Sequence, residues 1–357
     1  MNMRLHKTWR TALAVSAAAL VLLIGTAGIL GGVRHGIASS MPDQLAAGRW
    51  DGKGASQLSA FFAPGQGDVP GRIYSVTASV DRAMQDASLA APEGGRLWYC
   101  AYSTEVNMYA RTERDSTTLR VSVIGGEYFM IHQPDLLAGS YLQPGGANAG
   151  YVFLDERAAW KLFGAVNVVG MPVTLGDGEY IVCGVGAVPS GTVYDEAYGE
   201  TPRAYILYDS PAAASAREIT VYEAVLPNPV DGFALDVFEK NFTSGAEYTV
   251  VENSTRFTPS ALWEYSKHMD TLGVRTSPVT YPWWENVARV AQYRCASLLI
   301  AEIVLYALAL LLCLVWCGIA WKPTGDIISR GFHAGKEWAG ETYNRLTRVK
   351  HSAENKE

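Results

Sequence analysis

The chain has 357 residues, of which 49% are hydrophobic, and a formal net charge of −6. The first ten residues carry +3, residues 322–357 carry +2 and Glu302 carries −1, which leaves −10 for the portion between the ends. This acidic central portion argues against nucleic acid as a partner and against binding to an anionic lipid surface.

Two apolar stretches are long enough to cross a bilayer as helices, which takes about 20 residues. Residues 11–33 contain no charge, and residues 296–321 contain only Glu302. A cleaved signal peptide is the alternative for the first stretch. Its apolar run exceeds the usual length of about 7–15 residues, which favours an uncleaved anchor. We therefore expect two transmembrane helices.

The flanking cations predict the orientation of these helices. Arg4, Lys7 and Arg10 precede the first stretch, and three further cations follow the second between residues 322 and 336. The positive-inside rule places both termini, residues 1–10 and 322–357, in the cytoplasm. Arg289 and Arg294, just before the second stretch, weakly oppose this orientation. The sequence thus predicts a two-pass protein of the cytoplasmic membrane, with residues 34–295 on the extracytoplasmic side.

The first elements of the central portion alternate between strand and helix. Residues 56–63 form a predicted strand, residues 72–90 a helix and residues 96–110 one or two strands. The helix is indicated by apolar residues at spacings of three and four. These are Ile73, Val76, Val80, Met84 and Ala87.

The same order of elements returns about a hundred residues later. Residues 218–227 are a predicted strand, residues 228–242 a helix that starts at an Asn-Pro pair, and residues 246–253 a strand. Val230, Phe233, Val237 and Phe238 share one face of this helix. Two such βαβ-like units predict one split α/β layer, formed by residues 55–115 and 218–281, with an insertion between the halves.

The insertion, residues 116–217, is predicted to be β-rich and punctuated by glycine. A strand ends at Gly125-Gly126, and a second strand at 151–155 leads into a short helix that Gly164 closes. Residues 171–185 form a hairpin that turns on Gly176-Asp177-Gly178. The acidic stretch at 194–200 is interpreted as a solvated loop, because its spacing is not that of a calcium-binding EF-hand.

A short amphipathic helix is predicted at residues 282–295, directly before the second span. Its apolar face holds Trp283, Val287, Val290 and Ala291, and its polar face holds Glu285, Arg289 and Gln292. Trp283 and Trp284 are residue types that suit the water–lipid interface. An acid within a span is costly unless it is paired or hydrated, so Glu302 either pairs with a partner helix or lies protonated near the headgroups.

No catalytic or metal-binding constellation is present. Cys100 and Cys183 are interpreted as small buried residues, with a disulfide between them as the alternative. The histidines of the central portion, His35, His132 and His268, are isolated in the sequence, so each is interpreted as a surface or satisfied histidine rather than a ligand. The Gly-Lys feature near residue 335 has neither the spacing nor the Ser/Thr of a phosphate-binding loop. We expect no cofactor and no enzymatic activity.

The succession VIGGEYF, LLAGSYL, VFLDERAAWKLFG, VVGMPVTL and YIVCGV resembles the periplasmic core domain of MacB-type ABC transporter permeases. The split layer is similar to the Porter-like part of that domain and the insertion to its Sabre-like part. The resemblance implies an α+β extracytoplasmic domain whose motif residues are scaffold. Among them, Tyr128, Phe129, Leu162 and Phe163 are expected to pack into one core of the insertion. The matching motif positions are Gly126, Tyr128, Phe129, Gly139, Leu162, Phe163, Gly164, Gly170 and Gly184.

The resemblance also implies partners. MacB-type permeases resemble four-span proteins, whereas this chain has one predicted span after the domain. We therefore expect a non-enzymatic, permease-like subunit that works with an ABC ATPase and other membrane chains, and the pattern is also compatible with a homodimer. The alternative is a free-standing, membrane-anchored sensor or ligand-binding protein. Residues expected to contact partners or to carry movement are Trp283, Trp284, Glu285, Arg289 and Glu302.

Overall fold

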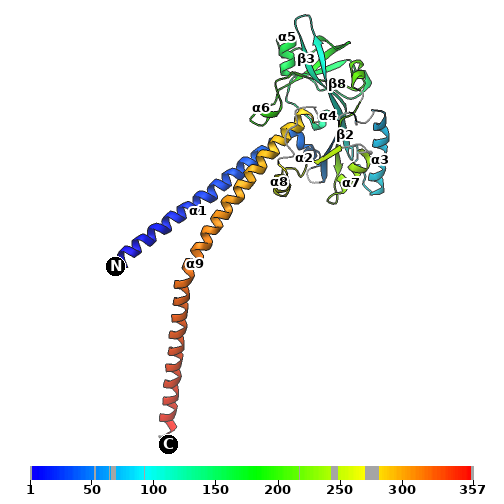
Figure 1. Cartoon of the computed structure of the whole chain (residues 1–357). Coiled ribbons are helices and arrows are strands. Elements are labelled where there is room, and N and C mark those ends of the chain that lie inside the picture. Colours follow the sequence, from blue (N-terminus) through cyan, green and yellow to red (C-terminus); the bar gives the residue numbers. More distant parts are fainter. Residues whose placement is uncertain are drawn as a thin grey trace. The chain divides into compact units, whose positions relative to one another are not determined.

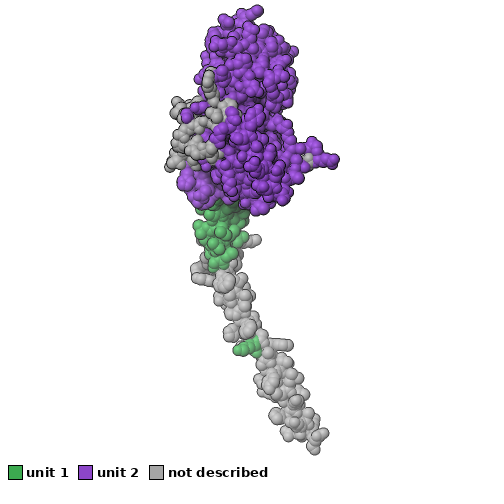
Figure 2. Space-filling view, turned by 90° about the vertical axis from the view of Figure 1, so that its right-hand side faces the viewer, with its two compact units in different colours: residues 1–32, 300–357 green, residues 33–299 purple. Residues whose placement is uncertain are grey.

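The computed structural model describes the backbone of residues 2–51, 54–63, 65, 70–91, 93–216, 218–242, 248–269 and 281–354. The chain divides into two compact units, which are coloured separately in Figure 2. Unit 2 consists of residues 33–299, and unit 1 consists of residues 1–32 and 300–357. The predicted strand start at residue 246 and the segment before Tyr281 lie outside the described residues.

Unit 2 is built on one ten-stranded sheet, with the order β10-β1-β9-β2-β3-β8-β5-β7-β4 and with β6 paired to β2 and β7. The predicted α+β class is confirmed, and the two predicted portions share this one continuous sheet. The strands are β1 (Ala55–Phe62), β2 (Tyr99–Arg111), β3 (Ser116–Gly126), β4 (Leu136–Gly139), β5 (Tyr151–Asp155), β6 (Pro172–Leu175), β7 (Gly178–Gly186), β8 (Arg203–Leu207), β9 (Val221–Pro227) and β10 (Tyr248–Glu252).

The two βαβ units interlock in the order β10-β1-β9-β2. Strands β1 and β2 flank β9, and β9 and β10 flank β1, each in antiparallel register. Helix α3 (Ile73–Asp86) joins the first pair and α7 (Phe233–Phe242) joins the second. The two helices lie side by side on one side of the sheet (Figure 1). The predicted split layer is therefore present, as a split β-α-β arrangement.

The insertion continues the sheet through the long antiparallel pair β2–β3. Strand β3 pairs in parallel with β8, and β5 pairs in parallel with β7. The hairpin β6–β7 turns on Gly176 and Asp177 as the sequence predicts. Helix α5 (Glu156–Phe163) follows β5; the Asp155 carboxylate accepts a hydrogen bond from Ala158 N at its start, and Gly164 ends it in a left-handed conformation.

Alternating side chains place different hydrophobic clusters on the two faces of the sheet. In β5, Val152 and Leu154 belong to a cluster under α5, whereas Phe153 belongs to a cluster on the opposite face. The face of α3 and α7 holds a third cluster, which includes the predicted residues Val76, Val80 and Met84. A side-chain period of two is what a strand buried on both faces requires.

One predicted packing arrangement is wrong. Leu162 is buried under α5 and Phe163 is half-buried against the same cluster, but Tyr128 and Phe129 lie in the cluster on the opposite face. There Phe129 packs against the rings of Phe153 and Tyr205. The four residues therefore divide between two cores on opposite faces of the sheet, and Ile124 of β3 already belongs to the core of Tyr128 and Phe129.

Glycine is required at two of the motif positions. Gly126 has φ +62°, and a Cβ there would collide with the carbonyl oxygen of Cys100 on the paired strand. Gly139 has φ +74°, and a Cβ there would collide with the carbonyl oxygen of Cys183. Any side chain at either position would therefore require the paired strands to move apart. Cys100 and Cys183 are free thiols rather than a disulfide.

Several short elements were not expected from the sequence, because each spans too few residues to show a period. Helix α7 also begins at Phe233 rather than at Asn228, so Val230 precedes it and is 70% exposed instead of lying on its buried face. The unexpected elements are strands β4 and β8 and the helices η1 (Pro42–Gln44), α2 (Ala46–Asp51), η2 (Pro70–Arg72), α4 (Tyr128–Ile131), η3 (Gly146–Asn148), α6 (Tyr194–Ala197), η4 (Pro211–Ser215) and α8 (Pro259–Ser266).

Two long helices begin and end the chain. Helix α1 runs from Asn2 to Ser39, and α9 runs from Trp283 to Glu354. By length and composition alone, their segments Thr11–Ser39 and Trp283–Ile319 could cross a membrane. Helix α9 thus joins the predicted amphipathic helix, the second predicted span and the tail without a break.

Candidate functional site

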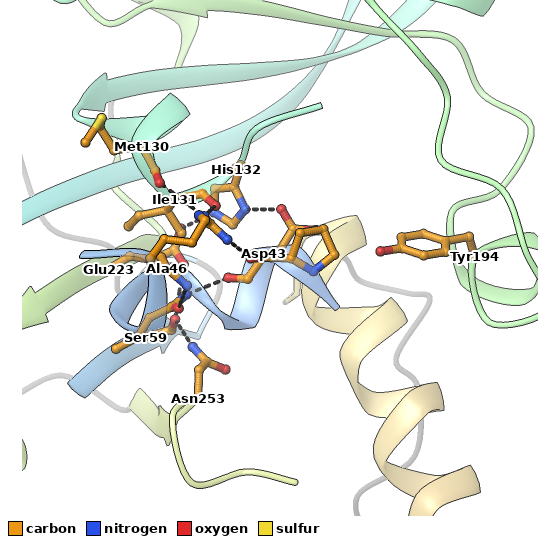
Figure 3. A network of polar contacts seen from close by, with 12 residues as sticks. Asp43, Ala46, Ser59, Met130, Ile131, His132, Tyr194, Glu223 and Asn253 are labelled. Carbon is orange, nitrogen blue, oxygen red and sulfur yellow. Dashed lines mark hydrogen bonds and ion pairs between the residues drawn. The ribbon is translucent and has the colours of Figure 1, made fainter. Parts of the chain in front are cut away.

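His132 occupies the centre of a buried polar network in unit 2. Its ring lies 2.8 Å from Asp43 through Nδ1 and 2.6 Å from Glu223 through Nε2, and the residue is 2% exposed. The ring is flanked by the rings of Tyr128 and Trp284, each with its centroid 4.6 Å away. The residue follows α4 directly, Asp43 belongs to η1, and Glu223 belongs to β9. Three segments far apart in the sequence meet at this histidine (Figure 3).

The surroundings of His132 favour its charged form. Burial acts to lower the pKa of the imidazole, but Glu223 and Asp43 outweigh burial and raise it to about 9. Both ring nitrogens face carboxylate oxygens, and only the imidazolium can donate from both. Burial raises the pKa of Glu223, while the charge of His132 opposes that rise. The pair is therefore held by opposite charges in a buried site.

Asp43 and Glu223 are themselves held by further contacts. Ser59 Oγ donates to Glu223 Oε1 at 3.2 Å. The Gln57 side chain donates to the Asp43 carbonyl and accepts from Ala46 N at 2.8 Å. These contacts fasten η1 and α2, the segments that follow α1, onto strand β1. The contacts orient both carboxylates toward the imidazole ring.

A second group of buried charges surrounds Glu285 in the first turn of α9. Its carboxylate accepts from Arg256 at 2.6 and 2.9 Å and from Arg289 Nε at 2.7 Å. Glu285 is 0% exposed, and Arg256 and Arg289 are also buried. Arg256 Nε also donates to Gln292 Oε1 at 3.0 Å, so one arginine outside α9 binds two residues that lie about two turns apart on this helix.

Asn253 joins the two groups. Its Nδ2 donates to Ser59 Oγ at 2.8 Å, and its Oδ1 accepts from Arg256 at 3.3 Å. A continuous buried polar chain results, with three acidic and three basic members joined by two neutral side chains. It runs through Asp43, His132, Glu223, Ser59, Asn253, Arg256, Glu285 and Arg289. This polar chain of side chains extends from the segment after α1 to the start of α9, and all of it lies inside unit 2.

The structure corrects the expectation that the start of α9 presents a surface to lipid or to a partner. Trp283, Trp284, Glu285 and Arg289 are all buried inside unit 2. Trp284 packs against Phe61 and His132. Glu285 and Arg289, on the polar face predicted for this helix, are buried as well. Their burial is tolerated because Arg256 pairs with the Glu285 carboxylate. These residues anchor α9 in the domain, and a role in carrying movement stays a proposal.

Glu302 lies in unit 1, where it is also buried. Its carboxylate packs beside Gly31 of α1: a Cβ at Gly31 would lie 3.4 Å from Glu302 Oε2. The sequence leaves open whether Glu302 pairs with a partner helix or lies protonated near the headgroups. The observed neighbour is the first long helix of the same chain.

No local sequence pattern indicates the polar chain. Its histidine is 89 residues from Asp43 and 91 residues from Glu223. Such separations leave no local pattern, and His132 was interpreted only as an isolated, satisfied histidine. Among the described residues, no group of three or more His, Cys, Asp and Glu side chains could hold a metal ion.

Residues 11–231 match the family model of the MacB-like periplasmic core domain. The chain belongs to this family. The match includes Asp43, His132 and Glu223 but ends before Arg256 and Glu285. The comparison with curated proteins gives no match.

Two solved structures are similar to part of the chain. The extracellular domain of the noncanonic ABC-type transporter YknZ from Gram-positive bacteria has 15% identity and a TM-score of 0.38, covering 55% of this chain and 99% of its own. The periplasmic region of MacB from Actinobacillus actinomycetemcomitans has 15% identity and a TM-score of 0.39, covering 56% of this chain and 89% of its own. Scores this low carry no inference about function.

Proposed function

We propose that this chain is a non-enzymatic subunit of an ABC-type membrane transporter, with unit 2 on the extracytoplasmic side and ATP hydrolysed by a separate polypeptide. Family membership supports the transporter assignment. In this proposal unit 2 docks other subunits and transmits conformational change to the long helices. Other membrane chains complete the translocation pathway in this proposal, since the described residues hold two candidate spans.

The buried polar chain is the observation that carries the transmission step. It ties η1, which follows α1, to the first turns of α9 through charged groups that are costly to separate. Removing one partner of a buried ion pair leaves an uncompensated charge, which typically costs about 3–5 kcal/mol. A displacement of either segment is therefore passed to the other before the polar chain breaks.

The same geometry speaks against a hydrolase. A serine hydrolase needs a histidine nitrogen free to take the proton of the nucleophile. Both nitrogens of His132 face carboxylates, and Ser59 donates to Glu223 rather than to the ring. The polar chain is thus suited to holding segments together rather than to proton transfer from a serine.

Purification of the intact protein from its native membrane tests the proposal. We expect an ABC-type ATPase to co-purify and the complex to hydrolyse ATP. Glu285→Gln removes the charge that pairs with Arg256 and Arg289, and we expect it to lower ATP hydrolysis by the complex while the ATPase still co-purifies. Mass spectrometry and a phosphate-release assay measure the two outcomes.

Glu264→Gln is the matched control, because Glu264 forms only an exposed pair with Lys267. We expect this variant to behave as the wild type. The absence of any ATPase from the purified wild type would support the free-standing sensor instead. Equal ATP hydrolysis by the Glu285→Gln and Glu264→Gln complexes would show that the polar chain does not transmit conformational change.

A further inference from the structure

A cavity of about 370 Å³ lies in unit 2 beside the polar chain. One wall comes from the segment after α1, including Asp43, and another from Trp283, the first residue of α9. The segment 186–190 and helix α6 complete it. In Figure 3 the Tyr194 side chain points toward the segment that holds Asp43, and its hydroxyl donates to Ser40 O at 3.2 Å.

Aromatic rings form most of the buried wall. Tyr128, Tyr194, Tyr198, Tyr205 and Trp283 all line the cavity and are less than a tenth exposed. The faces of such rings attract cations, and the attraction strengthens where water is excluded. The indole N–H of Trp283 lies near the Tyr205 hydroxyl. It makes no hydrogen bond of good geometry with that hydroxyl or with any other described residue. The cavity is therefore apolar in body, with donor and acceptor groups at its edge.

The charges on the cavity wall are mainly negative. Asp43, Asp135 and Asp155 line it, and its lining contains no lysine or arginine. His132 is the one basic residue of the lining, and Glu223 and Asp43 already neutralise it. Burial raises the pKa of Asp155 to about 6, which leaves the carboxylate ionised at neutral pH.

The arginine nearest to the Tyr198 ring lies outside the cavity lining. Arg203 is 4.7 Å from the centre of that ring and is paired at 3.2 Å with Glu105, a carboxylate that it shares with Arg120. Asp135 is exposed and lies at the cavity mouth, whereas Asp155 is buried. A positive ligand would thus meet one carboxylate on entry and another inside.

We propose that this cavity binds a small organic cation, a protonated amine attached to an aromatic or apolar body. The ammonium group lies toward Asp43 and Asp155, and the apolar body packs among the tyrosine rings. Nothing in the match to the family assigns a ligand here. The site adds a binding function to the chain and does not depend on the chain acting in a transporter.

A series of three dansyl compounds tests the charge requirement. Dansylcadaverine carries a primary ammonium, its N-acetyl derivative is neutral, and dansyl-6-aminohexanoate is an anion of similar size. Equilibrium dialysis against the full-length protein in lipid nanodiscs, with empty nanodiscs subtracted, measures their binding. We expect saturable binding of dansylcadaverine, and at least about tenfold weaker binding of the other two.

Three variants locate the binding. Asp155→Asn keeps an acceptor for the start of α5, because asparagine is as good an N-cap as aspartate. Asp135→Asn removes the charge at the mouth, and Ala187→Phe places a ring in the cavity. Asp115→Asn is the control, since Asp115 is exposed and not part of the cavity. We expect the first three to weaken dansylcadaverine binding about tenfold or more, and the control to leave it unchanged.

Three results overturn the proposal: no saturable binding of dansylcadaverine, equal binding of the cation and its neutral derivative, or binding unaffected by Asp135→Asn and Ala187→Phe. Asp135 is exposed, so its substitution tests the charge even where Asp155→Asn fails to fold. The binding assay requires no ATPase, so failure here is distinct from failure of the transporter assignment.

Discussion

At His132, burial and charge act on the protonation state in opposite directions. Burial disfavours the imidazolium, and the two carboxylates at 2.8 and 2.6 Å favour it. The carboxylates prevail, so the folded protein holds the proton more tightly than the unfolded chain does. This difference makes the stability of unit 2 depend on pH.

We expect the stability of the protein to fall as pH rises from about 6.5 to about 9. Below 6.5, His132 is protonated in both folded and unfolded states, and the full stabilisation is present. Between the two values only the folded state keeps the proton, so stability falls by about 1.4 kcal/mol per pH unit, or about 3 kcal/mol across the window set by the pKa of about 9. The raised pKa of Glu223 has the same sign of effect, but its loss of stability begins as pH rises above 4.5, the ordinary value for a glutamate. Unfolding of the purified protein followed by tryptophan fluorescence measures the decline.

The double variant His132→Gln/Glu223→Gln removes both titrating groups and can keep a hydrogen bond between the two amides. We expect its stability to be nearly constant over the same window. A wild-type profile that stays flat would mean that His132 is neutral in the folded protein.

Glu302 supports a second prediction, on the packing of the two long helices within unit 1. A side chain at Gly31 would press on the Glu302 carboxylate, whereas one at Gly32 would meet open space. We expect Gly31→Leu to lower the free energy of unfolding by about 1–3 kcal/mol through overpacking. Gly32→Leu makes the same change in composition at the next position and should cost little. Equal unfolding temperatures of the two variants in nanodiscs would show that Gly31 and Glu302 do not pack together.

At the scale of elements, helix α5 allows a test of whether burial or side-chain size decides the stability cost of a substitution to alanine. Leu162 is fully buried under this helix, while Phe163 is only half-buried. We expect Leu162→Ala to cost about 2–5 kcal/mol and Phe163→Ala less, although phenylalanine is the larger side chain. Chemical denaturation of the two variants measures the difference. A larger loss for Phe163→Ala would place Phe163 rather than Leu162 in the core.

The sequence predicted most elements of the sheet but not their faces. Strands such as β5 and the β6–β7 hairpin were recognisable because alternation and glycine turns are local signals. Whether Phe129 and Leu162 share a core depends on pairings between strands far apart in the sequence. The start of α7 shows the same limit. The Asn-Pro pair predicts a helix from Asn228, whereas the helix begins at Phe233 and the Asn228 side chain accepts a hydrogen bond from Ala234 N.

The candidate site was only partly predictable. The sequence singled out Trp283, Trp284, Glu285 and Arg289, and all four lie at the site. The sequence did not indicate that they are buried, because the residue that covers the polar side of α9, Arg256, follows β10. Only the folded chain brings that arginine to Glu285.

The continuity of α9 supports a test of transmission. Cys295, Ala296 and Leu299 are buried in unit 2, so a flexible insert belongs after Leu299, the last residue of that unit. We expect four glycines inserted there to abolish ATP hydrolysis by the complex. Helical hydrogen bonds make α9 stiff, and glycine disfavours the helix, so the insert would interrupt the stiff connection. Four alanines add the same length and rotation but keep the helix, so they should retain more activity. Equal activity of the two insertions would reject a stiff helix as the transmitting element.

At the scale of the whole molecule, the distribution of basic residues and the fold both bear on which side of the membrane unit 2 occupies. The basic residues at both ends predict cytoplasmic termini. Arg289 and Arg294 oppose this prediction in the sequence, but each is bound to an acid of unit 2. Arg289 Nε lies 2.7 Å from Glu285, and Arg294 lies 2.6 Å from Glu196. Once folded, these arginines stay with unit 2 on whichever side of the membrane it occupies.

We therefore predict that unit 2 is extracytoplasmic, and single cysteines in a variant without the five native ones test this in whole cells. Asp177→Cys and Thr192→Cys place thiols at exposed positions of unit 2, and Ser352→Cys places one in the tail of α9. A membrane-impermeant maleimide should label the first two in intact cells and the third only after the membrane is opened. The opposite pattern would reverse the orientation and place the cavity and the polar chain in the cytoplasm. Labelling at all three positions in intact cells would contradict the two-pass arrangement, because an even number of spans keeps both ends on the side opposite unit 2.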